Sequence, residues 1–293
     1  MTFNMKTKIG EIDYANIKPL FSYLNKKKLK DNRVEFDRAA PSTMNRKLEN
    51  GEIDVSIISS FSYAENAQRY VALPEVCVSS DGAVNSILLF SKKPIEELTY
   101  ADIALTATSA TSINLLKVIM HHFYQAKPRY QTMLPHLDTM LRTNDAALLI
   151  GDEAIKASWT VKEDLHVYDL GELWKKHTGH KMTYAIVAVR KSVLEKRSVI
   201  SMFHKEMIKS KVRNQKSNFR LVISMMQRRH GGSTMYWKKY FEGLKYDFRS
   251  REIQGLELFY HLAYEMNLLK QPVKVELFEP KTLKRKVKVA FSQ

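Results

Sequence analysis

The stretch CVSSDGAVNSILLF, from Cys77 to Phe90, decides how this chain is organised. Apolar, β-prone residues stand on both sides of a polar interruption that contains Asp81, Gly82 and Ser86. Asp-Gly between two strand-like runs is the commonest signal of a β-hairpin. Glycine and small hydroxyls are also what a ligand-binding wall needs, because they allow close approach and supply hydrogen bonds. The stretch by itself favours the turn and leaves the wall open.

Composition describes an ordinary globular protein. The chain has 293 residues, 44% hydrophobic and 27% charged, which is enough for two compact lobes or one large α/β unit. A single cysteine, Cys77, excludes an internal disulfide and fits a reducing compartment. The start, MTFNMKTKIGEIDY, lacks the apolar run of a signal peptide, and no later run is long enough to span a bilayer. The sequence predicts a cytoplasmic protein without membrane insertion.

The formal net charge of +16 is compatible with three kinds of partner: nucleic acid, an anionic membrane surface or an anionic substrate. The lysines are scattered, with runs at residues 26–30 and in the tail at residues 281–288. No helix-turn-helix, zinc-finger or RNP-like pattern accompanies them. Solvated faces and a basic tail explain the charge better than a nucleic-acid partner, which we do not expect.

The order of segments predicts an α/β fold. Between residues 8 and 66, short β-prone runs alternate with helical runs. This order is typical of a mainly parallel sheet, in which ligands bind beyond the carboxyl ends of strands. Asn16, Ser59 and Ser60 fall at such ends and are candidates for the functional site.

The alternation restarts after the opening stretch. A second α/β unit spans about residues 90–187, and beyond it the pattern is helical with basic faces. We therefore expect an inserted lobe at 90–187 and a discontinuous outer lobe made from residues 1–89 and 188–293. Two chain crossings between lobes create a hinge and a cleft, the arrangement in which binding proteins close on a ligand.

The strongest chemical signal is TSATS at the start of a predicted helix. A helix N-terminus carries unpaired N–H groups and the positive end of the helix dipole, so it attracts anions. Serine and threonine are also the usual N-cap residues, and this plainer explanation stays open. The hydroxyl residues of this segment are Thr108, Ser109, Thr111 and Ser112.

Other catalytic patterns are scarce. The sequence has no GxSxG, HExxH, Walker A or GxGxxG motif, and no His/Cys/Asp set with metal-ligand spacing. Asp152 follows the predicted strand AALLIG, where its carboxylate either binds a ligand or caps the next helix. We therefore expect neither a metal nor an organic cofactor. The residues alone predict a two-lobed protein that binds a small anion.

Several blocks of the sequence, taken in order, resemble the chorismate dehydratase family, which opens the futalosine route to menaquinone. The blocks cover roughly residues 8–190 and read DYANIKPL, GEIDVSIISSFSYAEN, VSSDGAVNSILLFSK, ATSATS, AALLIGDEA and YDLGELW. The resemblance implies a two-lobed fold of the type II periplasmic-binding-protein kind, with a central ligand cleft. It also implies a lyase that dehydrates chorismate to 3-(1-carboxyvinyloxy)benzoate without a metal or an organic cofactor.

The resemblance assigns roles to individual residues. The asparagine of the N-x-x-P-L block falls on Asn16, and the serine that ends the D-G-x-V-x-S block falls on Ser86. Both are implied to be catalytic, with the proton taken by the substrate's own enolpyruvyl carboxylate. Asp81 and Gly82 would then bend the chain so that Ser86 faces the cleft. The residues predicted to bind substrate are Ser59, Ser60, Ser109, Thr111, Ser112 and Asp152.

The sequence departs from the family pattern at His180-Lys181-Met182, where L-P-F is usual, and after Pro280. Two alternatives are weighed against the resemblance. The sister enzyme of the same route, a dihydroxynaphthoate synthase, has a catalytic histidine just after the strand matching AALLI. Gly151 occupies that position here and argues against it. The second alternative is a non-catalytic intracellular protein that binds a small aromatic carboxylate.

Overall fold

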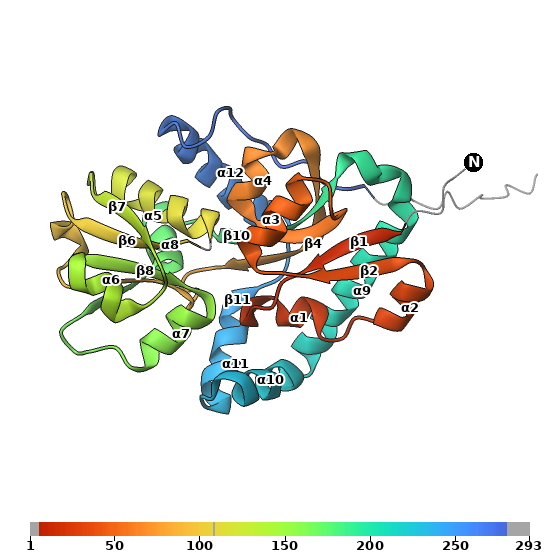
Figure 1. Cartoon of the computed structure of the whole chain (residues 1–293), viewed down its shortest axis with the longest axis horizontal. Coiled ribbons are helices and arrows are strands. Elements are labelled where there is room, and N and C mark those ends of the chain that lie inside the picture. The colour runs from red at the N-terminus through yellow and green to blue at the C-terminus, as the bar shows by residue number, and fades with distance from the viewer. Residues whose placement is uncertain (1–5, 108, 280–293) are drawn as a thin grey trace, which may run out of the picture.

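The computed structural model describes residues 6–107 and 109–279, and its strands gather in two sheets (Figure 1). The first sheet has the order β11-β4-β10-β3-β1-β2, and the second has the order β7-β6-β8-β5-β9. The strands of the first sheet are β1 (Thr7–Glu11), β2 (Val34–Arg38), β3 (Val55–Ser59), β4 (Tyr70–Ser80), β10 (Met182–Arg190) and β11 (Leu244–Lys245). Those of the second are β5 (Ile87–Ser91), β6 (Asp102–Thr106), β7 (Arg129–Met133), β8 (Ala146–Ile150) and β9 (His166–Asp169).

Both sheets are mixed. Strand β1 pairs in parallel with β2 and β3, as the sequence predicts, but β10 lies antiparallel between β3 and β4. In the second sheet β6 pairs in parallel with β7 and β8, while β5 is antiparallel to β8 and β9. Strand β11 is also antiparallel to its neighbour β4. Strands β5 and β10 are the ones at which the chain enters a sheet directly from the other sheet.

The two strands of the opening stretch belong to different sheets, so the hairpin interpretation is wrong. Strand β4 ends at Ser80 and pairs with β10 and β11, whereas β5 begins at Ile87 and pairs with β8 and β9. Residues 81–86 cross from one sheet to the other. The chain returns between Asp169 and Met182. The domain boundaries predicted at residues 89/90 and 187/188 stay predictions.

The carboxylate of Asp169 holds the first crossing in place. It accepts hydrogen bonds from the backbone N–H groups of Val84 at 3.0 Å and Asn85 at 2.6 Å. It also accepts one from Gly171 at 2.8 Å, so it caps the helix that follows. Asn85 has a left-handed backbone with φ of 58°. Because the N–H groups of Val84 and Asn85 are both held, the path of the chain into Ser86 is fixed.

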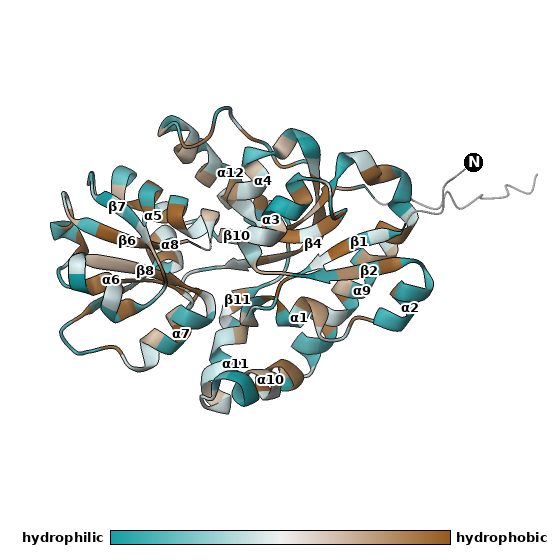
Figure 2. Ribbon diagram, viewed as in Figure 1, coloured by the Kyte–Doolittle hydropathy of each residue, from teal (hydrophilic) through white to brown (hydrophobic). Residues whose placement is uncertain are grey.

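Helices cover both sheets. Figure 2 shows much of the strand surface as hydrophobic, while the helices carry hydrophilic residues among hydrophobic ones. A short 3-10 helix, η1 (Ala15–Ile17), follows β1. The α-helices are α1 (Lys18–Phe21), α2 (Lys26–Asp31), α3 (Pro41–Glu49), α4 (Ser60–Glu65), α5 (Ala110–His122), α6 (Leu137–Thr143), α7 (Gly151–Trp159), α8 (Leu170–Thr178), α9 (Arg197–Lys216), α10 (Arg220–His230), α11 (Thr234–Gly243) and α12 (Ser250–Glu265).

One apolar core runs from the first sheet into the second. Helix α5 of the second sheet packs against α4 and α12 of the first. Phe259 of α12 lies 6.0 Å from Phe61 and 6.1 Å from Trp174, measured between ring centroids. It therefore joins the two halves of the molecule, by which we mean the first sheet with its helices and the second sheet with its helices. A separate, smaller cluster that contains Leu88 and Phe90 covers another part of the second sheet. Within residues 6–107 and 109–279, no helix combines the length and apolarity needed to cross a membrane.

Candidate functional site

A cleft lies where the two sheets meet, at the ends of the two crossings. The cavity in it has a volume of about 70 Å³. Among the described residues that line it there is no Lys, Arg, His, Asp or Glu. The lining consists of hydroxyls, one amide and apolar side chains: Ile12, Tyr14, Asn16, Ile17, Pro41, Ile58, Ser59, Ser86, Ile87, Ser109, Ser112, Ile150, Gly151, Tyr184 and Ala185.

Asn16 reaches the cleft from η1, the turn that follows the first strand. Its Oδ1 atom is buried and accepts no hydrogen bond from any residue that the structure describes. A buried polar atom without a partner costs roughly 1–3 kcal/mol. Such an atom at the wall of a cleft is expected where a ligand completes the hydrogen bonding.

Ser86 faces the cleft from the end of the first crossing and is 1% exposed. Its backbone carbonyl accepts a hydrogen bond of 2.7 Å from the N–H of Gly151, which has φ of +58°. That left-handed conformation suits glycine and is strained for other residues. The side-chain Oγ lies 3.3 Å from the hydroxyl of Tyr240 and 3.4 Å from the carbonyl of Val84. Ser86 and Asn16, far apart in the sequence, therefore share one cavity.

Ser109 and Ser112 at the start of α5 form a helix cap and also line the cleft. Ser109 is the N-cap and its Oγ accepts a hydrogen bond of 3.2 Å from the N–H of Ser112. Both side chains also line the cleft. The helices α3 and α7 begin at the same cleft, through Pro41 and Gly151. Three helix starts thus meet at the cleft. Pro41 has no N–H, and the N–H of Gly151 already donates to the carbonyl of Ser86. The anion site itself stays a prediction. Thr108 lies outside the described residues.

Ser60 and Thr111 do not line the cleft. The Oγ1 of Thr111 accepts a hydrogen bond of 3.0 Å from the N–H of Phe61 and lies 3.2 Å from the Oγ of Ser60. Ser60 donates in turn to the carbonyl of Thr183 at 2.8 Å. The structure thus places both residues in the contact between α4 and α5, where they join the two halves.

Asp152 does not cap its own helix, so the capping interpretation is wrong. Its Oδ1 accepts a hydrogen bond of 3.3 Å from the N–H of Ala15, beside Asn16, and its Oδ2 lies 3.2 Å from the Nε2 of His230. Burial raises the pKa of Asp152 and lowers the pKa of His230. Asp152 therefore braces the turn that carries Asn16, and lines a neighbouring pocket with Lys156.

Sequence reasoning missed four side chains at or near the cleft, and one of them is Tyr14, which lines it from the residue before η1. Tyr184 lines it and its hydroxyl lies 2.8 Å from the Oγ of Ser80. Tyr240 and His230 come from the C-terminal helices, where the sequence showed only helical patterns with basic faces. The alternation of strand β10 was a usable signal for Tyr184, since every second residue of a strand faces one side. No local pattern indicates Tyr240 or His230.

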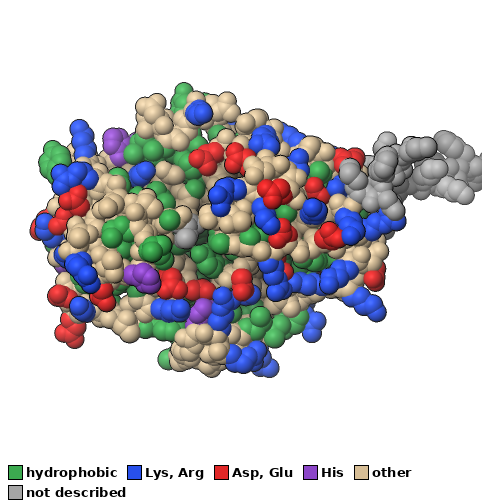
Figure 3. Space-filling view, viewed as in Figure 1, with side chains coloured by type: hydrophobic (Ala, Val, Ile, Leu, Met, Phe, Trp, Pro, Cys, Tyr) green, Lys and Arg blue, Asp and Glu red, His purple; other side chains and the backbone are tan. Residues whose placement is uncertain are grey.

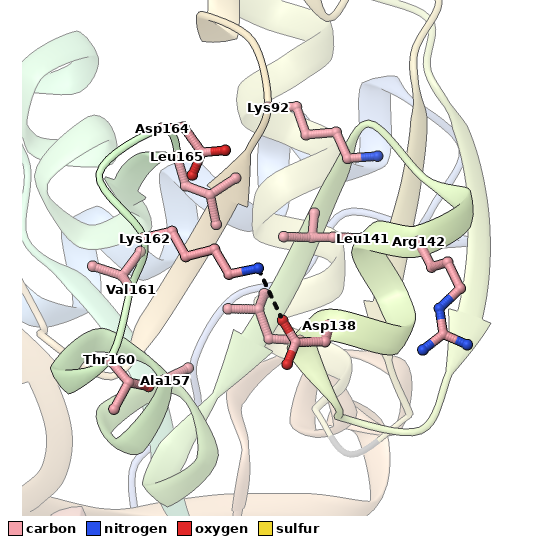
Figure 4. A pocket seen from close by; sticks show the side chains of 11 residues that line it. Lys92, Asp138, Leu141, Arg142, Ala157, Thr160, Val161, Lys162, Asp164 and Leu165 are labelled. Carbon is pink, nitrogen blue, oxygen red and sulfur yellow. Dashed lines mark ion pairs between the residues drawn. The ribbon is translucent and has the colours of Figure 1, made fainter.

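A larger open hollow, with a volume of about 620 Å³, lies elsewhere, on the half that contains the second sheet (Figure 4). Lys162 and Asp138 form an ion pair of 4.0 Å across it. None of the predicted site residues lines this hollow, and its polar lining is largely charged. Within the described part of the chain, no three His, Cys, Asp or Glu residues gather as a metal site. The cleft is therefore the candidate site.

Comparison with known proteins adds sequence relatives. A family model described as menaquinone biosynthesis matches residues 7–265. A chorismate dehydratase from Thermus thermophilus is 31% identical over 265 residues, covering 86% of this chain and 93% of the relative. A chorismate dehydratase from Campylobacter jejuni is 27% identical over 207 residues, covering 70% of this chain and 75% of that relative.

Solved structures show the fold. Protein AF1704 from Archaeoglobus fulgidus superposes with a TM-score of 0.71 at 19% identity, covering 91% of this chain and 100% of its own. The periplasmic aliphatic sulphonate binding protein SsuA from Escherichia coli superposes with a TM-score of 0.65 at 14% identity, covering 96% and 94%. The predicted two-lobed fold of the periplasmic-binding-protein kind is thereby confirmed.

Proposed function

This chain belongs to the menaquinone biosynthesis family, and we propose that it works by a substrate-assisted elimination in the cleft between its two sheets. Its reaction is the dehydration of chorismate, which makes it a lyase. We further place it in the futalosine route and in the cytoplasm. The single cysteine, a buried free thiol, is compatible with that reducing compartment.

The chemistry suits a site without a strong base. One ring C–H bond and the neighbouring C–OH bond break, a ring double bond forms, and the ring becomes aromatic in 3-(1-carboxyvinyloxy)benzoate. In the proposal the enolpyruvyl carboxylate takes the ring proton, and that proton leaves with the hydroxide as water. The protein then acts by positioning a dianion and by hydrogen bonding to the atoms that change charge.

The observation that carries this proposal is the composition of the cleft. Its described lining holds Asn16 and Ser86 beside apolar and hydroxyl side chains, without a carboxylate, imidazole or amine. A general base needs a pKa near the working pH, and neither an amide nor an alcohol has one. The carboxylate on the substrate is the remaining base within reach.

We assign separate roles to the two residues. Asn16, which lines the cleft, orients the enolpyruvyl arm through its amide N–H groups, which donate to the carboxylate of the arm. Ser86 donates a hydrogen bond to the hydroxyl that leaves. A substrate carboxylate is held by Ser59, Ser109 and Ser112 together with the helix starts around them. The remaining predicted residues, Ser60, Thr111 and Asp152, support this wall from behind.

The deciding experiment incubates the purified protein with chorismate and follows the aromatic product by absorbance and mass spectrometry. We expect Ser86→Ala to lower kcat by at least about tenfold with little change in KM, because the lost bond forms mainly in the transition state. Ser91→Ala is the matched control, since Ser91 is buried in β5 and donates to the carbonyl of Lys93 at 2.6 Å, away from the cleft.

Three other outcomes are informative. Binding of chorismate without any product would indicate the non-catalytic binding protein instead. An equal loss of kcat in Ser86→Ala and Ser91→Ala would contradict the role assigned to Ser86. It would not contradict the assignment of chorismate dehydration to the protein. Absence of both binding and product would contradict the activity itself.

A further inference from the structure

A buried tyrosine from the C-terminal helices touches the side chain of Ser86. Tyr240 lies in α11, is 2% exposed, and its hydroxyl is 3.3 Å from the Oγ of Ser86. Its ring packs against Trp237, with centroids 5.6 Å apart, and against Phe241, with centroids 5.3 Å apart. The ring is held on two sides, so its hydroxyl has a fixed position relative to the cleft.

The donors and acceptors around the side chain of Ser86 determine where its hydroxyl proton can point. A serine Oγ accepts through its lone pairs and donates one proton. In the contact with Tyr240 the phenol donates and the Oγ of Ser86 accepts. Within the protein, the proton of Ser86 can reach the carbonyl of Val84 at 3.4 Å. This distance, like the 3.3 Å from Tyr240, is longer than that of an ordinary O–H···O hydrogen bond. The serine proton is therefore available to a ligand in the cleft.

We propose that Tyr240 is a positioning residue for the dehydration: its donated hydrogen bond turns the O–H of Ser86 toward the leaving hydroxyl of the substrate. The inference rests on the proposed function and adds a residue to it. No proton leaves Tyr240 in this arrangement, so no covalent step is added to the reaction. The phenol donates to a lone pair of the Ser86 Oγ, and this bond favours the rotation of the serine O–H that points away from Tyr240 and toward the substrate.

The surroundings keep Tyr240 in the form that donates. Burial raises its pKa well above the ordinary value, mainly by desolvation. The phenol therefore stays protonated throughout the pH range in which an enzyme of this kind is assayed. Ser86 consequently receives a donor, and never a charged phenolate, at every such pH.

A second buried tyrosine provides a matched control. Tyr246 is 0% exposed and follows strand β11. Its hydroxyl makes no hydrogen bond with any residue that the structure describes, and Tyr246 does not line the cleft. Replacing either tyrosine with phenylalanine removes one buried hydroxyl and keeps the ring. The two variants differ in whether Ser86 loses its donor.

The test is a double-mutant cycle on the full chain with chorismate as substrate. We expect Tyr240→Phe to lower kcat by about tenfold, equivalent to about 1.4 kcal/mol, with KM within about twofold. Tyr246→Phe should keep the wild-type kcat. In the Ser86→Ala background, Tyr240→Phe should cause no further loss, because the residue through which it acts is gone. The very low rates of the variants are measured in single-turnover reactions, with enzyme in excess over substrate, that are followed for several hours.

The outcomes separate this inference from the function. A wild-type kcat in Tyr240→Phe would overturn it, as would the same fractional loss in the wild-type and Ser86→Ala backgrounds. If Ser86→Ala has no measurable rate, the decision rests on kcat alone: a loss in Tyr240→Phe without one in Tyr246→Phe supports the inference, and equal values overturn it. If wild-type protein forms no product from chorismate, the proposed function fails first.

Discussion

The Oγ1 of Thr111 accepts a hydrogen bond of 3.0 Å from the backbone N–H of Phe61, and this bond joins the two halves of the molecule. Phe61 lies in the first turn of α4 and Thr111 in the first turn of α5. The N–H groups of a first helical turn have no partner within their own helix. A side chain from one half therefore satisfies a backbone group of the other.

Removing that acceptor should destabilise the protein. Thr111→Val keeps the volume and leaves the N–H of Phe61 buried without a partner, which costs about 1–3 kcal/mol of the free energy of unfolding. Urea unfolding followed by circular dichroism measures it. Thr111→Ser keeps an Oγ and loses only one methyl group, worth about 0.8 kcal/mol. If the valine variant is no less stable than the serine variant, the bond does not hold the halves together.

Asn16 tests the anionic character of the ligand. Asn16→Asp and Asn16→Ala both remove the amide donor, but only the aspartate adds a negative charge to the cleft. We expect the aspartate variant to raise the KM for chorismate by about tenfold more than the alanine variant, or about 1.4 kcal/mol. Steady-state kinetics at neutral pH measure the difference. Equal KM values would show that the substrate's charges do not lie near residue 16.

The pH dependence tests where the base is. Burial lowers the pKa of His230 below its ordinary value of about 6.5. A histidine base must be neutral, so if His230 were the base, kcat would fall as the pH decreases through that lowered pKa. We expect no such limb, and we expect His230→Gln to keep the wild-type profile. If the profile has such a limb and His230→Gln abolishes it in a folded protein, the base is this histidine and not the substrate carboxylate.

Ligand entry requires a wider cleft. Pockets for small molecules measure roughly 300–1,000 Å³, whereas the cavity in the cleft measures about 70 Å³. We therefore expect the halves to separate around the crossings when chorismate enters and to close on it. Hydrogen exchange should show stronger protection of the amides at residues 109–113 with the aromatic product bound, and unchanged exchange in the middle of α9. Identical exchange with and without product would contradict the movement.

The sequence predicted those parts of the molecule that short-range patterns control. The strand at 102–106 and the helix at 110–122 agree with its periodicity. That Ser86 and Asn16 line one cleft agrees with what the family resemblance implied. On the stretch alone, Asp81-Gly82 favours a hairpin, which is wrong because turn chemistry says where a chain bends and not which sheet the next strand joins. The bend implied by the family resemblance, with Ser86 facing the cleft, agrees with the structure.

Long-range contacts explain the other differences. The sequence places Thr111 among the substrate-binding residues, but in the structure its Oγ1 accepts a hydrogen bond from the N–H of Phe61 in the other half. Tyr240 could not be found from sequence, because its only distinction is the contact with Ser86, 154 positions away. Figure 3 shows Lys and Arg scattered among Asp and Glu over the face in view. The expected absence of a nucleic-acid partner stays a prediction.

The position of β10 between β3 and β4 has a consequence for synthesis of the chain. The neighbours in sequence, β3 and β4, do not pair with each other, and the slot between them is filled only by residues 182–190. On the ribosome the first sheet therefore stays split into two open edges until more than half of the chain has emerged. The strands of the second sheet all lie within residues 87–169, so they have all emerged before residues 182–190 are made. The second sheet is therefore able to fold before the first is complete. Exposed edges invite pairing with other chains, so the first ninety residues on their own are the part most prone to aggregate.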